Sequence, residues 1–535
     1  MLPHLGALLA SFVLALIFTP CVRSFAIRWG ITDEPDDRRK LHRRTVARAG
    51  GTAVLLAVLV VCVGAFLTFD VSSFDVPSLV PFAALLVGML AIWALGLADD
   101  IWTLRGRQKL VGQILVATLL ASAGYSIRSV QFMGWTIELG VFSLLASVVW
   151  LLGTTNALNL IDGADGLCST LGAIICGSLG ILSAVHGHFA ESAIAFALCG
   201  ALLGFLVFNF PPASIFLGDS GSMLVGMVAG ALAIRCSLKG PAGVAFLAPM
   251  AILALPLMDS VMAIVRRTLT GRSIYTTDRA HLHHTLRNRG LNDIGLLMVV
   301  AGLSLLTAGA ALAGAILEMD WLGPASVGLV FAGLVASKAF GYAEMVLIAK
   351  RGTHFALSLV GPASKSKTEH YSRAVHMQGT RNWETVWLTL IEFAEREDLK
   401  SLQLDLNVPW LEEGFHAVWK NVNSGEHAER DERWSTALPI RADGRVVGRL
   451  NVAGAATSQQ SLSALSRLVE LIEDLAPQIE LVMYPEMMLP PECQVDSDLP
   501  DSSRPHQPAA ASQDSPSNDS EPRYGPTRRH AAVEG

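Results

Sequence analysis

The chain has 535 residues, of which 52% are hydrophobic and 16% are charged, and its mean hydropathy is +0.45. Soluble proteins carry about a quarter charged residues, so this composition excludes an ordinary soluble chain. The net charge of −6 says little by itself, because positive and negative residues are concentrated in different parts of the chain. We expect no nucleic-acid partner. None of the seven cysteines forms a CxxC pair, which argues against a zinc site and structural disulfides.

Long apolar runs fill the first two thirds of the chain. A membrane-spanning helix needs about 20 mostly apolar residues, and the first run lacks the basic start and cleavage site of a secretory signal. We therefore expect a polytopic all-α membrane domain over residues 1–350, with about eleven spans. These are 5–27, 50–69, 79–98, 110–125, 138–156, 167–185, 189–208, 220–238, 243–265, 294–316 and 322–347.

Lys and Arg are concentrated in alternate loops. They gather in segments 28–48, 105–109 and 266–289, which follow the first, third and ninth expected spans. Loops on the opposite side carry few, the exceptions being Arg128, Arg235 and Lys239. The positive-inside rule then predicts an N-terminus outside and a cytoplasmic C-terminal region.

After residue 350 the composition becomes that of a soluble protein. The pattern predicts a small α/β domain over 368–488. Its expected elements are a strand at 370–380, a helix at 382–397, a strand at 401–407, a helix near 409–420, a hairpin over 434–453 and a helix near 461–484. Residues 489–535 are rich in Pro, Ser, Asp and Gln, which predicts a disordered tail.

Polar clusters fall at those span ends that the charge rule places in the cytoplasm. They occupy 99–100, 156–166, 216–222 and 278–284. Several carboxylates at helix ends repel one another unless a cation lies among them. Asp and Asn oxygens suit Mg²⁺, which binds one or two carboxylates together with substrate phosphates. Glycine-flanked turns and a helix N-terminus favour phosphate, so the combination indicates a magnesium-bound diphosphate at the membrane surface.

Each cluster alone has a simpler explanation. An Asp-Asp pair at a helix end is commonly a solvated cap, a DGxDG sequence a turn, GDSGS a helix start, and HxHH a polar loop. The basic segment 38–48 can serve topology alone. The functional hypothesis depends on the clusters occurring together.

In this order and on these spans, the motifs resemble the MraY/WecA/TagO family of polyprenyl-phosphate N-acetylhexosamine-1-phosphate transferases, in glycosyltransferase family 4. The likeness covers about residues 5–347. It is carried by DEP at 33–35, RKLH at 39–42, RAGG at 48–51, DD at 99–100, KLxxQ at 109–113, NAxNLxDGxDGL at 156–167, Asn209, GDSGS at 218–222 and DRxHLHH at 278–284.

The resemblance implies transfer of a sugar-1-phosphate from a UDP-sugar to undecaprenyl phosphate with release of UMP, to initiate a cell-envelope polysaccharide. The HxHH pattern is similar to the WecA/TagO branch, which implies UDP-N-acetylglucosamine or a close relative as donor. It also implies Mg²⁺, with Mn²⁺ as an alternative ion. We favour direct attack by the lipid phosphate, in which Asp99 or Asp100 positions the phosphate or acts as a weak general base. A mechanism through a covalent aspartyl intermediate stays open.

The residues that match the family's motifs have three expected roles. We expect catalysis from Asp99, Asp100, Asp162 and Asp165, metal binding by Asn156 and Asp219, and substrate binding by Lys40, His42, Lys109, Asn159, Arg279, His281, His283 and His284.

Two other functions are compatible with membrane helices that carry acids. One is a secondary transporter, although its acids would be expected nearer the membrane centre. The other is a membrane-anchored sensor. The family branch implies a multi-pass protein of the bacterial inner membrane with a cytoplasmic active site. A homodimer and a protein partner for the C-terminal domain stay open.

Overall fold

The structure is a computed structural model. It describes residues 2–33, 45–68, 76–132, 135–237, 246–270, 281–346, 348–349, 353, 370–378, 381–408, 411, 413–421, 433–455 and 458–484. The predicted tail and the predicted boundary between residues 350 and 368 lie almost entirely outside these ranges.

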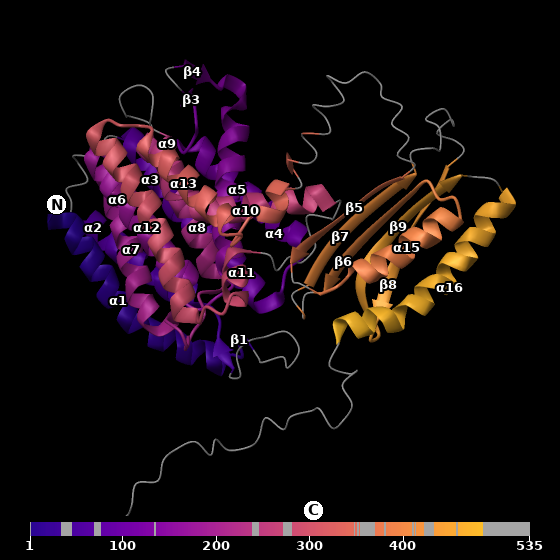
Figure 1. Cartoon of the computed structure of the whole chain (residues 1–535). Helices are drawn as coiled ribbons and strands as arrows, with labels where there is room; N and C mark the ends of the chain where they lie inside the picture. Colours follow the sequence, from indigo (N-terminus) through magenta and orange to yellow (C-terminus); the bar gives the residue numbers. More distant parts are fainter. Residues whose placement is uncertain are drawn as a thin grey trace, which may run out of the picture. The chain divides into compact units, whose positions relative to one another are not determined.

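The N-terminal region is mostly helical (Figure 1). Its elements are α1 (Leu2–Arg28), β1 (Thr32–Asp33), β2 (Val46–Ala47), α2 (Gly50–Thr68), α3 (Val76–Trp102), α4 (Gly106–Ser122), β3 (Ser129–Phe132), β4 (Trp135–Glu138), the 3₁₀ turn η2 (Gly140–Phe142), α5 (Ser143–Ile161), α6 (Leu167–Val185), α7 (Phe189–Asn209), α8 (Gly218–Ser237), α9 (Leu247–Ile252), α10 (Ala254–Thr270), α11 (Leu282–Asn288), α12 (Asp293–Leu317) and α13 (Leu322–Ala336).

Six helices in the described ranges are long and apolar enough to cross a membrane. They are His4–Arg28, Val80–Trp102, Gly140–Ile161, Leu167–Val185, Phe189–Asn209 and Asp293–Leu317. Two shorter apolar helices cover Gly50–Ala65 and Leu322–Ala336. The multi-pass character predicted from the sequence is confirmed, and the count of eleven stays a prediction.

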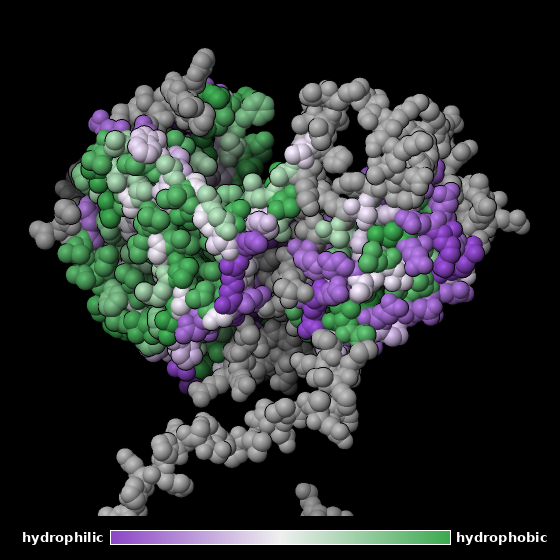
Figure 2. Space-filling model, in the orientation of Figure 1, coloured by the Kyte–Doolittle hydropathy of each residue, from purple (hydrophilic) through white to green (hydrophobic). Residues whose placement is uncertain are grey.

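Helix α1 illustrates how apolar residues are divided between membrane and core. Leu5, Leu9, Val13 and Ile17 recur every four residues, and each is more than half exposed. This spacing places them on one stripe of the helix. In a soluble protein such a stripe would be costly, whereas lipid is an apolar solvent. Figure 2 shows hydrophobic residues over much of the visible face of the helical region.

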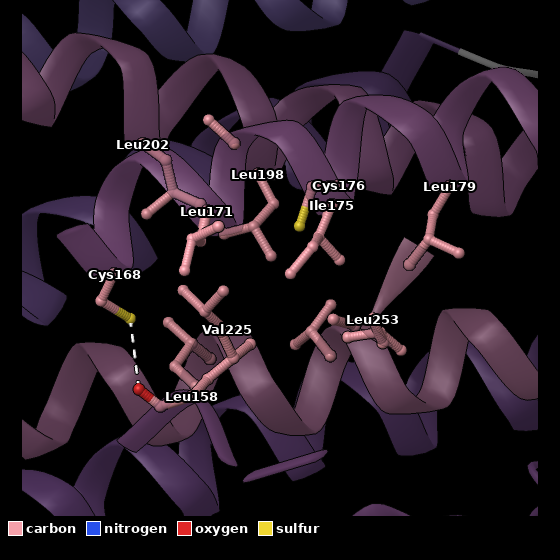
Figure 3. Close-up of a cluster of buried hydrophobic side chains, with 14 of the residues drawn as sticks. Leu158, Cys168, Leu171, Ile175, Cys176, Leu179, Leu198, Leu202, Val225 and Leu253 are labelled. Carbon is pink, nitrogen blue, oxygen red and sulfur yellow. Dashed lines mark hydrogen bonds between the residues drawn. The ribbon is translucent and has the colours of Figure 1, made fainter. Parts of the chain in front are cut away.

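Branched apolar side chains fill the space between the helices behind that surface. In the core, Leu158 of α5, Leu171 and Ile175 of α6, Leu198 of α7 and Val225 of α8 are fully buried and point toward one another (Figure 3). Helices α5 to α8 therefore form a rigid centre, and their ends position the polar clusters.

Two expected spans differ in the structure. The run 243–265 is divided into α9 and α10 at Leu253. Pro256 lacks the N–H that would continue the helical hydrogen bonds to Ile252, which explains the break. The run 322–347 ends as a regular helix at Ala336, and Lys338 takes a left-handed φ of +56°.

The C-terminal region is an antiparallel five-stranded sheet of order β5-β7-β6-β9-β8, with two helices along one face (Figure 1). Its elements are β5 (His370–Gln378), α15 (Glu384–Arg396), β6 (Ser401–Val408), β7 (Glu413–Asn421), β8 (Arg433–Ala442), β9 (Arg445–Ala455) and α16 (Ser458–Met483). Alternate residues of β6 and β7 meet in pairs, such as Leu402 with Trp419 and Leu406 with Phe415, and their side chains are buried.

The helix predicted near 409–420 is wrong, because β7 occupies Glu413–Asn421 and pairs with both β5 and β6. Phe415, Ala417 and Trp419 are fully buried at alternate positions, a period-2 pattern typical of a strand. The predicted hairpin is confirmed. It turns at Asp443 and Gly444, both with positive φ.

Candidate functional site

Four helix ends bring a lysine and two aspartates together. The Nζ atom of Lys109, in the first turn of α4, lies 3.0 Å from Asp99 Oδ2, 2.6 Å from Asp219 Oδ2 and 3.1 Å from Asn159 Oδ1. Asp99 ends α3, Asn159 ends α5 and Asp219 begins α8. Three oxygens thus surround one positive charge. We call Asp99, Lys109, Asn159 and Asp219 the acidic cluster.

The turn between α3 and α4 sets the first half of this cluster. Thr103 has a φ of +50°, and Leu104 N donates to Asp99 Oδ1 at 2.6 Å. The chain therefore reverses directly after α3, and Lys109 returns to the carboxylate. One oxygen of Asp99 holds the turn while the other meets the ammonium.

Asp100 holds the start of α8. Its two oxygens accept from Asp219 N at 2.9 Å and Ser220 N at 3.0 Å, amides that a helix start leaves without intrahelical partners. Gly218 has a φ of +74°, and a Cβ there would lie 2.7 Å from Asp100 Oδ2. Asp219 is thereby fixed by its backbone. Its side chain is fixed by Asn159, whose Nδ2 donates to Oδ1 at 2.6 Å.

The turn between α5 and α6 contains the next two predicted acids. Asp162 follows the last residue of α5, and burial, together with the charges of Asp219 and Asp100, raises the pKa of its carboxyl well above its usual value. Asp165 Oδ2 accepts from Ala213 N at 2.9 Å and joins this turn to the segment before α8. The charges of Asp219 and Asp100 therefore act on Asp162 in the same direction as its burial.

The histidine motif lies beside this turn. His281 and His283 are buried and His284 is half-buried. Their rings follow one another, with centroids 6.0 Å apart for His281 and His283 and 4.3 Å apart for His283 and His284. A Cβ added to Gly163 would lie 2.5 Å from His283 Nε2, so the ring packs directly on the glycine.

His283 makes no hydrogen bond through either ring nitrogen within the described part of the chain. Burial, then the neighbouring His284 and His281, lowers the pKa of His283 well below its usual value. A neutral ring with one donor and one acceptor is therefore presented beside the α5–α6 turn.

Asn156 lies one helical turn before Asn159 and has other partners. Its Nδ2 donates to Gln113 Oε1 at 2.9 Å and to Leu152 O at 2.8 Å. Asn159, and not Asn156, is the amide hydrogen-bonded to Asp219. The assignment of Asn156 to the metal stays a prediction.

Lys40, His42 and Arg279 lie outside the described residues. The ends of the segment that carries Lys40 and His42 are nevertheless anchored. Ala47 of β2 bridges to Ile215 and accepts from Phe216 N at 2.9 Å. Phe216 comes shortly before Asp219 in the sequence, so β2 contacts the segment that leads into α8.

The acidic cluster has the donor chemistry that Mg²⁺ requires. Two carboxylate oxygens and one amide oxygen already converge on one cation, Lys109 Nζ. Hard oxygen ligands supplemented by phosphate oxygens and water are typical for Mg²⁺. Within the described ranges, no three His, Cys, Asp or Glu side chains form a group that could hold a metal ion alone. The residues therefore fit a cation that is shared with a phosphate.

One buried acid of this region was not predicted. Asp259 of α10 is 1% exposed and contacts His281. It is an acid inside the apolar run 243–265, and that is the signal by which it could have been found, because ionisable residues within membrane segments are commonly functional.

Residues 82–237, from α3 to α8, match the family described as glycosyl transferase family 4. The chain is 32% identical over 296 residues to a Bacillus subtilis protein named "probable undecaprenyl-phosphate N-acetylglucosaminyl 1-phosphate transferase", covering 55% of this chain and 80% of that one. It is 35% identical over 308 residues to a decaprenyl-phosphate N-acetylglucosaminephosphotransferase of Mycolicibacterium smegmatis, covering 53% and 75%. It is 30% identical over 295 residues to a phospho-N-acetylmuramoyl-pentapeptide-transferase of Halalkalibacterium halodurans, covering 52% and 88%.

Proposed function

The chain belongs to glycosyl transferase family 4, and on that premise we propose that it transfers N-acetylglucosamine-1-phosphate, or a related N-acetylhexosamine-1-phosphate, from a UDP-sugar to undecaprenyl phosphate. UMP is released, and the lipid-linked product initiates a cell-envelope polysaccharide. The observation that carries the proposal is the acidic cluster, in which Asp99 and Asp219 meet the Lys109 ammonium at the ends of three helices.

The reaction exchanges one phosphorus–oxygen bond for another. An oxygen of the lipid phosphate forms a bond to the β-phosphorus of the donor, and the bond from that phosphorus to the bridging oxygen breaks, so the electron pair leaves with UMP. A phosphate monoester has a second pKa of about 6, so the attacking oxygen is already largely ionised at neutral pH. The protein's main contribution is then positioning and charge neutralisation.

The two adjacent acids take different roles in this proposal. Asp100 uses both oxygens to hold the start of α8, so it positions Asp219. Asp99 has one oxygen directed at Lys109, and it orients the lipid phosphate that the ammonium attracts. Asp165 ties the α5–α6 turn to the segment before α8, while Asp162 orders the donor side of the site.

We propose Mg²⁺ as the resident ion, with Mn²⁺ as an alternative. Asp219 would hold it, with Asn159 as the amide already beside that carboxylate and Asn156 as the amide that the family pattern implies. When bound, the ion neutralises diphosphate charge. The Lys109 ammonium, which contacts Asp219 Oδ2, would neutralise part of the same charge.

The histidine motif is assigned to the donor. The packing of His283 on Gly163 places its ring nitrogens, which have no hydrogen-bond partner among the described residues, beside the turn that contains Asp162. Arg279, two residues before His281, and the basic segment with Lys40 and His42 would add charge for the diphosphate and the lipid phosphate. The HxHH pattern favours UDP-N-acetylglucosamine over a muramoyl-pentapeptide donor.

We further propose about eleven passes through a bacterial inner membrane, with the N-terminus outside and the acidic cluster in the cytoplasm. The Lys and Arg of segments 28–48, 105–109 and 266–289 support this orientation. The relatives named above are all transferases, which favours an enzyme over a transporter or sensor.

The test is UMP release by the purified full chain in detergent, with undecaprenyl phosphate and a panel of UDP-sugars, with and without Mg²⁺. We expect release that depends on both lipid and metal, with UDP-N-acetylglucosamine as the preferred donor. Asp219→Asn should abolish it, whereas Glu191→Gln, a carboxylate paired with Arg235 at the far end of α8, should not. Release with another UDP-sugar would correct the donor. If folded protein releases no UMP with any donor, the proposed transferase activity is refuted.

A further inference from the structure

Asp259 is a buried carboxylate with two polar partners and no place in the reaction as described so far. It lies in α10 and is 1% exposed. Its Oδ2 lies 3.0 Å from His281 Nδ1, and its Oδ1 accepts from Leu282 N at 2.9 Å. Both oxygens therefore contact the start of the histidine motif, from a helix that is separate in sequence.

This contact determines which nitrogen of His281 carries its proton. A carboxylate oxygen accepts hydrogen bonds, so Nδ1 is the protonated nitrogen of the ring. Nε2 is then the nitrogen left for another partner. A carboxylate behind a histidine commonly fixes tautomer and ring orientation in this way.

The same contact aligns the other histidines. The His281 and His283 rings are nearly parallel, at 9°, and His283 packs on Gly163 in the turn that contains Asp162. Because Asp259 also holds the Leu282 amide, it fixes the backbone between the first two histidines. A displacement of the Asp259 side chain would therefore move the rings of His281, His283 and His284 relative to the α5–α6 turn.

We propose that Asp259 is a positioning residue for the transfer reaction: it fixes the tautomer of His281 and the placement of His281, His283 and His284 beside the α5–α6 turn. The inference rests on the proposed function, because its effect is exerted on the histidines assigned to the donor. Asp259 itself touches neither substrate.

The decisive variant is Asp259→Asn, which keeps the size of the side chain. Asn Oδ1 can still accept from Leu282 N, but its Nδ2 donates toward His281 and favours the tautomer protonated at Nε2. We expect kcat/KM for UDP-N-acetylglucosamine to fall by about 10–100-fold, the usual effect of removing such a partner. The melting temperature should change little, and Glu191→Gln should retain wild-type kcat/KM.

A double-mutant cycle separates positioning from general damage. If Asp259 acts through His281, adding Asp259→Asn to His281→Ala should cause little further loss of kcat/KM. Full additivity of the two losses would overturn the inference, as would an Asp259→Asn enzyme with wild-type kcat/KM.

Nitrogen-15 NMR of histidine-labelled protein supplies a readout that does not need activity. His281 is identified by the resonance lost in His281→Ala. We expect Nδ1 protonation in the wild type and a change toward Nε2 protonation in Asp259→Asn. The same tautomer in both proteins would refute the inference. The expected tautomer change in a protein that releases no UMP with any donor would instead locate the failure in the proposed function.

Discussion

Replacing Lys109 by Met tests the acidic cluster most directly. The change removes the ammonium 2.6 Å from Asp219 and 3.0 Å from Asp99, and leaves two carboxylates close together without their cation. The side chains are 16% exposed for Lys109, 10% for Asp99 and 32% for Asp219. Breaking a buried pair costs about 3–5 kcal/mol, and water at Asp219 favours the lower end, about 3 kcal/mol.

The assay is thermal unfolding in detergent, with and without MgCl₂, beside the UMP-release measurement. At about 2 °C per kcal/mol, the loss corresponds to a melting temperature lower by about 6 °C. Activity should fall by about 10²–10³-fold, as when one charge-stabilising donor is removed. Arg107→Met, an exposed cation on the same helix, should leave the melting temperature unchanged.

The magnesium arm distinguishes a cation site from an ordinary ion pair. If Mg²⁺ and Lys109 neutralise the same carboxylates, added MgCl₂ should raise the melting temperature of Lys109→Met by more than that of the wild type. Equal shifts in both proteins would refute this reasoning about shared neutralisation. If the Lys109→Met protein has the same melting temperature as the wild type, the acidic cluster does not contribute to stability as argued.

Further predictions follow from the close contacts and charges of the site. Gly96→Ala should inactivate the enzyme, because the new Cβ would lie 2.5 Å from Asp219 O and displace the start of α8; Gly153→Ala, with nothing within 4 Å, is the matched control and should be active. The raised pKa of Asp162 means that wild-type stability falls as pH rises through that pKa. In Asp162→Asn, melting temperature should therefore depend less on pH, and parallel pH curves would contradict this. A chain truncated after residue 350 should keep lipid-dependent UMP release, and complete loss from folded protein would show that the C-terminal region is required.

The parts of the fold with a strong local pattern were predictable from the sequence. Apolar length identified the long helices, and the period-2 pattern with Asp443-Gly444 identified the hairpin. The strand β7 was missed because its first residues, Glu413 and Gly414, carry little strand preference. Its structure depends on pairing with β5 and β6, which are separated from it in sequence.

The site was predictable as a set of residues and less so in its internal contacts. Asp99, Lys109, Asn159 and Asp219 were all expected, and the structure brings them together. The sequence pattern could not separate the roles of Asp99 and Asp100, because both end the same helix. Only the approach of α8 shows that Asp100 holds amides of that helix.

Helix α8 links the chemistry of the site to the orientation of the chain. It has 20 residues and is therefore about 30 Å long, enough to cross the hydrocarbon core of a membrane. Asp219 lies at its first turn and Arg235 at its last. Arg235 was an exception to the charge rule, but its guanidinium is 2.7 Å from Glu191 and lies 5.9 Å from the Tyr125 ring centroid. Its charge is thus paired within the folded protein. Arg235 remains one of few cations on its side, whereas Lys and Arg are numerous in segments 28–48, 105–109 and 266–289. The bias therefore still favours the proposed arrangement, in which the acidic cluster faces the cytoplasm and the Arg235–Glu191 pair lies at the opposite end of α8.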